Sequence, residues 1–243
     1  MLLRSAASTH VGMNRQSNED RYAIVADLGL YLVADGMGGH KAGQVASHLA
    51  AEGSIRAIEA LQGASVSLAE RLRHAVACAN REIFTAAQAK PELSGMGTTF
   101  VGMLFGGGRL ALAHVGDSRA YLLRQGRLHG LTDDHSIVGE LLRRHEISEA
   151  DAAQHPHRHV LTRALGTRPR TEPDLAEMTP QEGDVFIMCS DGLTGFVDDK
   201  EITEHLMSEP DLEAAAAALV DTANRAGGQD NITVLLVRYE KEA

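Results

Sequence analysis

The sequence predicts an α+β fold in which antiparallel sheets are covered by helices. Short apolar runs of strand length recur along the chain, and they do not alternate regularly with helices as a doubly wound parallel sheet would require. Three long Ala-rich segments have helical spacing instead. The expected strands are 22–26, 31–34, 98–105, 110–115, 120–123, 185–189 and 232–239, and the expected helices are 42–61, 67–89 and 212–226.

The segment 136–165 differs from the rest of the chain. It contains short helical pieces, many His and Arg residues and several turn residues. Ser148 and Asp151 have the spacing of a capping box, which starts a short helix there. We therefore expect this segment to be an irregular flap that leaves the sheet core. The three glycines at 106–108 predict a hairpin loop between two strands.

The composition indicates one globular domain spanning residues 1–243. Apolar residues make up 44% of the 243 residues, and no Pro/Gly-rich linker divides them. Aromatic residues make up only 4%, so the core is expected to be aliphatic. Cys78 and Cys189 are far apart in the sequence, which favours a reducing compartment over a disulfide framework. No signal peptide or membrane span is evident, so we expect a soluble, cytoplasmic protein without membrane insertion.

The formal net charge of −10 argues against binding of nucleic acid or of anionic lipid surfaces, because both carry negative charge. An acidic balance is compatible with a carboxylate-rich site for cations. It does not establish such a site, since many soluble proteins are equally acidic.

Acidic residues lie at the ends of the predicted strands, beside glycine or another small residue. They are Glu19, Asp20, Asp35, Asp117, Asp191 and Asp230. A carboxylate at a strand end is held rigidly and still reaches solvent, and small neighbours let a ligand approach the backbone. Carboxylates that meet at one sheet edge repel one another, and a cation relieves that repulsion. Oxygen ligands favour Mg²⁺ or Mn²⁺, and no Cys/His spacing predicts zinc.

Six short motifs carry a resemblance to a known family. They are Arg15-x-x-Asn18-Glu19-Asp20, Val33-Ala34-Asp35-Gly36-Met37-Gly38-Gly39-His40, Gly97-Thr98-Thr99, Val115-Gly116-Asp117-Ser118-Arg119, Ser190-Asp191-Gly192-Leu193 and Asp230-Asn231-Ile232-Thr233. With these motifs in this order, the sequence resembles the metal-dependent serine/threonine protein phosphatases (protein phosphatase 2C, PPM type), in their compact bacterial form. Each motif alone is weak, but six in order across nearly the whole chain are specific.

The resemblance implies a four-layer α-β-β-α sandwich with two metal ions, Mn²⁺ or Mg²⁺, at one end. It implies hydrolysis of phosphoserine and phosphothreonine on proteins by a metal-bridging hydroxide. The expected partners are phosphorylated proteins, the targets of a bacterial serine/threonine kinase in a signalling system. We expect the protein to be a monomer.

The metal ligands follow from the same resemblance. Asp35 would bridge both ions, and the carbonyl of Gly36 would complete the shell of one of them. Asp191 and Asp230 would bind the other ion. Asp117, together with Asp191, would form the third metal site described in bacterial members.

Other residues would act around the metals. Glu19 and Asp20 would hold metal-bound waters. Arg15 would bind the phosphate, because a guanidinium can grip two phosphate oxygens at once. His159, in the flap, would contact the phosphopeptide.

Several residues have simpler alternative interpretations. Asp117 could pair with Arg119 or cap a turn, and Arg15 could be a surface arginine. The histidines at 155–159 are more simply a solvated loop than a metal tract. Three other functions also remain open: an inactive binding relative of the same fold, a phosphatase dedicated to one regulatory protein, and a sugar or nucleotide phosphatase.

The general acid is the least defined role. Met37 occupies the position at which animal enzymes carry a histidine proposed as the acid for the leaving group. His40 and a metal-bound water are the two candidates that remain for this role.

If His40 is the acid, His40→Ala should slow hydrolysis of alkyl phosphates more than that of aryl phosphates, which have better leaving groups. The measurement is the ratio of kcat on the two substrate types. Equal slowing of both would remove His40 from this role.

Overall fold

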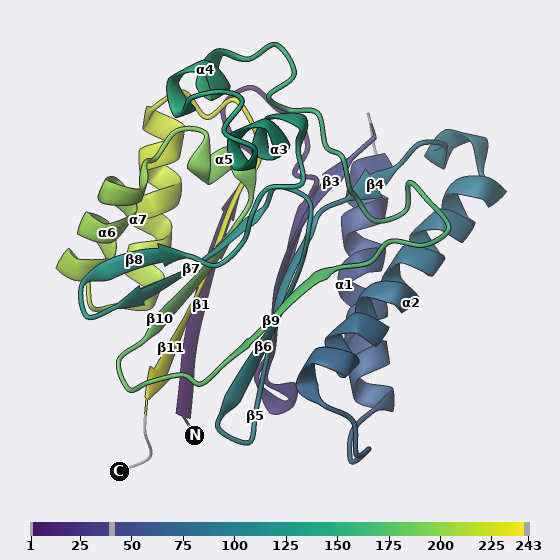
Figure 1. Cartoon of the computed structure of the whole chain (residues 1–243), viewed down its shortest axis with the longest axis horizontal. Coiled ribbons are helices and arrows are strands. Elements are labelled where there is room, and N and C mark those ends of the chain that lie inside the picture. Colours follow the sequence, from purple (N-terminus) through teal and green to yellow (C-terminus); the bar gives the residue numbers. More distant parts are fainter. Residues whose placement is uncertain (1, 39–41, 241–243) are drawn as a thin grey trace.

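Two antiparallel β-sheets stack face to face, and helices cover the outer face of each sheet (Figure 1). The structure is a computed structural model and describes residues 2–38 and 42–240. This four-layer arrangement confirms the predicted α-β-β-α sandwich. Both sheets are antiparallel throughout, as the absence of a regular βαβ alternation predicts.

The first sheet consists, in spatial order, of β1 (Leu2–His10), β11 (Ile232–Glu240), β10 (Val185–Cys189), β7 (Arg119–Arg124) and β8 (Arg127–Gly130). The second consists of β2 (Asp20–Val25), β3 (Leu30–Met37), β5 (Phe100–Gly106), β6 (Arg109–Val115) and β9 (Asp174–Met178), with the short β4 (Gly97–Thr98) paired to the end of β3.

The helices form the two outer layers. The second sheet packs against α1 (Ala42–Ala60) and α2 (Leu68–Ala89), and the first against α5 (Asp191–Thr194), α6 (Asp199–Ser208) and α7 (Leu212–Arg225). Two short 3-10 helices, η1 (Ala26–Leu28) and η2 (Pro91–Leu93), lie in connections. Within the described residues, no helix has the length and apolar character needed to cross a membrane.

Side chains of the central strands alternate between two apolar layers. In β3, Leu30, Leu32 and Ala34 face α1 and α2, whereas Tyr31 and Val33 face the other sheet. This follows from the two-residue period of a strand, and it explains why the run is apolar without interruption. A strand with one solvated face would alternate with polar residues.

Three aromatic rings lie at the centre of the interface between the sheets. Phe105 packs edge-to-face against Tyr31, with ring centroids 5.7 Å apart, and against Phe186, at 5.5 Å. The rest of this layer is mostly Val, Leu and Met. The core is therefore largely aliphatic, as predicted, but its centre holds three of the chain's few aromatic residues.

The flap closes over one end of the sandwich. It contains α3 (Ile137–Arg143) and α4 (Glu149–Gln154), which lie at the same end as α5 in Figure 1. Ser148 and Asp151 form the predicted capping box at the start of α4. The two ends of the flap meet in an antiparallel bridge between Ser136 and Leu161.

Among the described residues, three strands and two helices were not predicted: β1, β8, β9, α5 and α6. The three strands lie at sheet edges and keep many exposed or half-buried residues, so their sequences lack a clear apolar alternation. The nine residues of β1 pair along their full length with β11, and that pairing defines the strand. Intrinsic strand propensity alone is too weak a signal to predict edge strands of this kind.

Phe186→Ala should lower the free energy of unfolding by about 3–5 kcal/mol, because the fully buried ring would leave a cavity between the sheets. Urea denaturation measures this change. Met207→Ala is the matched control, since that side chain is 61% exposed and its loss should change stability by no more than about 0.5 kcal/mol. Equal changes in the two variants would contradict the packing described here.

Candidate metal centre

Five aspartates that are far apart in the sequence come together at the flap end of the sandwich. Asp35 and Asp20 face each other in the β2–β3 pair. Burial raises the pKa of Asp35 well above its ordinary value, and the negative charges of Asp20, Asp191, Asp117 and Asp230 raise it further. These charges act on Asp35 because the two sheets and the segments between their strands all contribute carboxylates to the same region.

The backbone of Asp35 is fixed by two threonines of the neighbouring segment. Thr99 Oγ1 accepts a hydrogen bond from the Asp35 N–H at 2.9 Å, and Thr98 Oγ1 donates to the Asp35 carbonyl at 2.8 Å. The Thr99 N–H also donates to this carbonyl. Asp35 lies within β3, two residues before its end, whereas the sequence predicted it at the strand end. The two threonines position the carboxylate, although the sequence had suggested only strand formation for them.

Asp20 is buried and has an incomplete set of partners. Its Oδ2 accepts hydrogen bonds from Ser190 and Thr233, each at 2.7 Å, whereas its buried Oδ1 has none. Burial raises the pKa of Asp20 to about 7, against the opposing effect of these two hydrogen bonds. A buried carboxylate oxygen without a donor is costly unless a cation or water satisfies it.

Asp191 begins α5, directly after β10 and Ser190. Its buried Oδ1 has no hydrogen-bond partner. Burial and the charge of Asp230 raise the pKa of Asp191. Neighbouring carboxylates that raise one another's pKa values ionise together more easily when a positive charge compensates them.

These residues fit a hard divalent cation. The donor set is oxygen only, two buried oxygens lack donors, and the carboxylates raise one another's pKa values. Among the described residues, however, no group of three or more His, Cys, Asp or Glu side chains is arranged so that it could hold a metal ion as it stands. The acids therefore influence one another electrostatically, and their side chains would have to adjust to coordinate an ion.

Arg15 lies at the same site. Its Nη2 donates to Asp230 Oδ2 at 2.7 Å, and half of its side chain is exposed. Arg15 is thus more than an isolated surface arginine, because its guanidinium stands at the rim of the carboxylate cluster. Asp230 precedes β11 by two residues, as the sequence predicted.

Asn231 connects the segments of the site, although the sequence placed it only within a motif and assigned it no role. Its Oδ1 accepts from the Glu19 N–H at 2.8 Å, and its Nδ2 donates to the carbonyls of Val11 and Ser17, both at 2.9 Å. A single side chain therefore holds the chain around Glu19 against the start of β11. In the sequence, the signal for this role was the position of an asparagine directly after Asp230 and directly before a predicted strand.

Gly36 lies where the backbones of β3 and α1 approach closely. A Cβ at this position would overlap the carbonyl of Gly43 and come within 2.7 Å of the Glu19 carbonyl. Only glycine allows this approach. The close approach keeps the Gly36 backbone beside Asp35 and Glu19, where the resemblance places a carbonyl ligand.

Asp117 lies among the other carboxylates, and the arginine suggested as its partner binds elsewhere. Arg119, its suggested partner, instead forms a two-point ion pair with Asp134 at 2.9 and 2.8 Å. Burial, followed by the charge of Asp191, raises the pKa of Asp117 to about 8. Asp117 is therefore part of the carboxylate cluster.

The two candidate histidines differ. His159 is exposed in the flap, and its charge opposes the rise in the pKa of Asp191, so it lies near the cluster. His40 lies outside the described residues. Cys78 and Cys189 are both free, and Cys189 is buried in β10 as expected.

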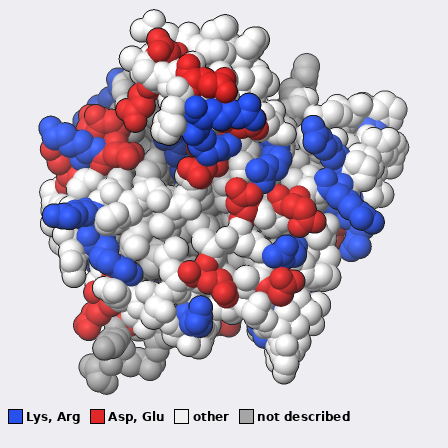
Figure 2. All heavy atoms as spheres, viewed as in Figure 1, with Lys and Arg blue, Asp and Glu red and all other residues white. Residues whose placement is uncertain are grey.

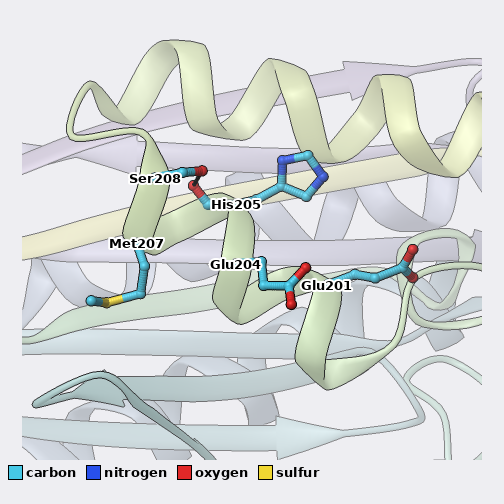
Figure 3. A pocket seen from close by; sticks show the side chains of 5 residues that line it. All are labelled: Glu201, Glu204, His205, Met207 and Ser208. Atoms are coloured by element: carbon cyan, nitrogen blue, oxygen red, sulfur yellow. Dashed lines mark hydrogen bonds between the residues drawn. The ribbon is translucent and has the colours of Figure 1, made fainter.

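A surface hollow of about 550 Å³ lies elsewhere, on α6. It is lined by Glu201, Glu204, His205, Met207 and Ser208. Figure 3 shows these side chains pointing in different directions along the helix, and none is a candidate site residue. His205 forms a hydrogen bond to Thr222 of α7 at 3.1 Å. The hollow thus gives no indication of the chemistry.

The raised pKa values predict how stability depends on pH without metal. Asp20 and Asp117 titrate at about 7 and about 8 in the folded protein, but at about 4 when unfolded. The stability that these two groups contribute is complete below about pH 4. It is lost as the pH rises to about 8, because the folded protein binds more protons than the unfolded protein in this range. Urea unfolding with a chelator should show this loss. Asp117→Asn, which cannot ionise, should lose less stability over the same range; an unchanged pH dependence in that variant would contradict the assignment.

The chain is similar to known proteins over nearly its whole length. The family model described as protein phosphatase 2C matches residues 9–236. The serine/threonine phosphatase stp of Listeria monocytogenes is 41% identical over 241 residues, covering 96% of this chain and 94% of that protein. The serine/threonine protein phosphatase PstP of Mycobacterium tuberculosis is 40% identical over 236 residues, covering 97% of this chain and 45% of that protein.

Solved structures agree with these matches. The crystal structure of the Mycobacterium tuberculosis serine/threonine phosphatase PstP/Ppp superposes with a TM-score of 0.90 and 39% identity, covering 99% of this chain and 100% of that one. The PstP catalytic domain in complex with two manganese ions gives a TM-score of 0.87 and 38% identity, covering 98% and 99%. This chain belongs to the protein phosphatase 2C family.

Proposed function

We propose that this protein is a metal-dependent phosphatase that hydrolyses phosphoserine and phosphothreonine on other proteins. The observation that carries the proposal is the convergence of five aspartates, two of which have buried oxygens without hydrogen-bond partners. Relatives that are 40–41% identical over most of this chain are named serine/threonine phosphatases. An inactive relative would have lost some of these acids.

Asp35, the Gly36 carbonyl, Asp191 and Asp230 would hold two ions, Mn²⁺ or Mg²⁺, and Asp117 with Asp191 would hold a third. When bound, the ions supply a water of lowered pKa as nucleophile and positive charge for the phosphoryl oxygens. Hydrogen bonds fix the backbone of Asp35 and one carboxylate oxygen of Asp20, which supports a defined position for both residues in this role.

Arg15 would bind the phosphate of the substrate. Its guanidinium already stands beside Asp230 and is half exposed, so a phosphate can reach it from solvent. Two N–H groups directed at two phosphoryl oxygens neutralise charge that develops during transfer. Glu19 and Asp20 would orient waters in the site, and His159 would contact the phosphopeptide from the flap.

We propose that residues 1–243 form one catalytic domain, with the flap at about 136–165, which acts as a cytoplasmic monomer. Its substrates would be targets of a serine/threonine kinase in a signalling system. On the face in Figure 2, basic side chains are interspersed with acidic ones and do not form a continuous stripe. That pattern and the net charge of −10 support protein substrates over nucleic acid.

Hydrolysis of a phosphothreonine peptide should require added Mn²⁺ or Mg²⁺ and stop with chelator. Asp191→Ala should lower kcat by at least about 100-fold and weaken Mn²⁺ binding, because it removes a ligand from the cluster. The exposed Asp221 on α7 provides the control, and Asp221→Ala should retain wild-type activity. Full activity in thoroughly demetallated buffer would disprove this function.

A further inference from the structure

His135, at the base of the flap, holds both backbone polar groups of Gly116. The His135 N–H donates to the Gly116 carbonyl at 2.8 Å, and the Gly116 N–H donates to His135 Nδ1 at 3.1 Å. Gly116 directly precedes Asp117. Its φ is +108°, and a Cβ there would come within 2.6 Å of the Thr99 side chain, so this backbone conformation requires glycine.

These contacts fix the tautomer of His135. A backbone N–H is always a donor, so Nδ1 must be the nitrogen without a proton and Nε2 must carry it. Nε2 then donates to Asp174 Oδ2 at 3.1 Å, and Asp174 Oδ1 accepts from Arg163 Nη1 at 2.6 Å. The ring is thereby oriented from both sides, with its acceptor toward Gly116.

His114 of β6 packs against the same ring. The two ring centroids lie 4.5 Å apart with a tilt of 34°, and both residues are almost fully buried. His114 Nε2 has no hydrogen-bond partner, so its ring contributes packing on that side. The His135 ring therefore has little freedom to turn away from Gly116.

The two ends of the flap are joined at the same residue. The His135 carbonyl accepts from the Thr162 N–H at 2.8 Å, and the Ile137 N–H donates to the Val160 carbonyl at 2.9 Å. His135 thus contacts both the far end of the flap and the segment before Asp117.

We propose that His135 is a positioning residue: its Nδ1 fixes the Gly116 backbone and so places the Asp117 carboxylate in the metal site. The proposal rests on the proposed function only for the role of Asp117 as a metal ligand. Residues that orient metal ligands typically change metal affinity or activity by about 10–100-fold when replaced.

Two variants separate the ring's two hydrogen bonds. His135→Asn retains an acceptor near the position of Nδ1 but does not reach Asp174. His135→Gln reaches toward Asp174 but leaves no acceptor for the Gly116 N–H. His129→Gln, at an exposed position on β8, controls for the substitution itself.

Two quantities are measured: the Mn²⁺ concentration for half-maximal hydrolysis of an aryl phosphate, and amide hydrogen exchange at Gly116 in metal-free protein. His135→Gln should raise the Mn²⁺ requirement by about 10–100-fold and speed exchange at Gly116. His135→Asn and His129→Gln should stay close to wild type in both. Wild-type values in His135→Gln, or equal impairment of His135→Asn, would overturn the proposal.

The wild-type protein provides a test that needs no variant. Nitrogen-15 NMR of the His135 ring should show a proton on Nε2 and none on Nδ1, and the opposite tautomer would overturn the proposal even if His135→Gln failed to fold. Absence of any Mn²⁺-dependent hydrolysis in wild type would instead refute the proposed function. The tautomer and the Gly116 exchange would still decide the role of His135.

Discussion

Repulsion between carboxylates at one end of the sandwich is the constraint on which the rest of the structure depends. Burial raises the pKa of Asp35, and the negative charges of four other aspartates raise it further. A protein that holds such groups together without a cation loses stability as they ionise. The scaffold must therefore be rigid enough to prevent the acids from moving apart.

The packed interface between the sheets provides that rigidity. Tyr31, Phe105 and Phe186 interlock at its centre, and Tyr31 lies only four residues before Asp35 in the same strand. The β2–β3 register sets Asp20 opposite Asp35. A shift of one residue would turn each side chain to the other face, so the apolar core and the acid cluster depend on the same register.

Small polar side chains complete the site at its edges. Asn231 connects the start of β11 to the chain around Glu19, while Ser190 and Thr233 both donate to Asp20. Thr99 connects Asp35 to the segment of Asp117 through a 2.7 Å hydrogen bond to Ser118. Asp35 and Asp20 are thus held by neighbours that carry no charge, so the negative charges of these two carboxylates remain available to a cation.

The sequence by itself determined the central strands, the long helices and the identity of the acids, because apolar period and motif order are local properties. Strand β10 and helix α1 lie close to where their patterns predicted them. The edge strand β1 could not be predicted, since its order comes from pairing with β11 more than two hundred residues away. Only the tertiary structure paired Arg119 with Asp134 and placed His135 on Gly116, because such contacts depend on how distant segments meet in space.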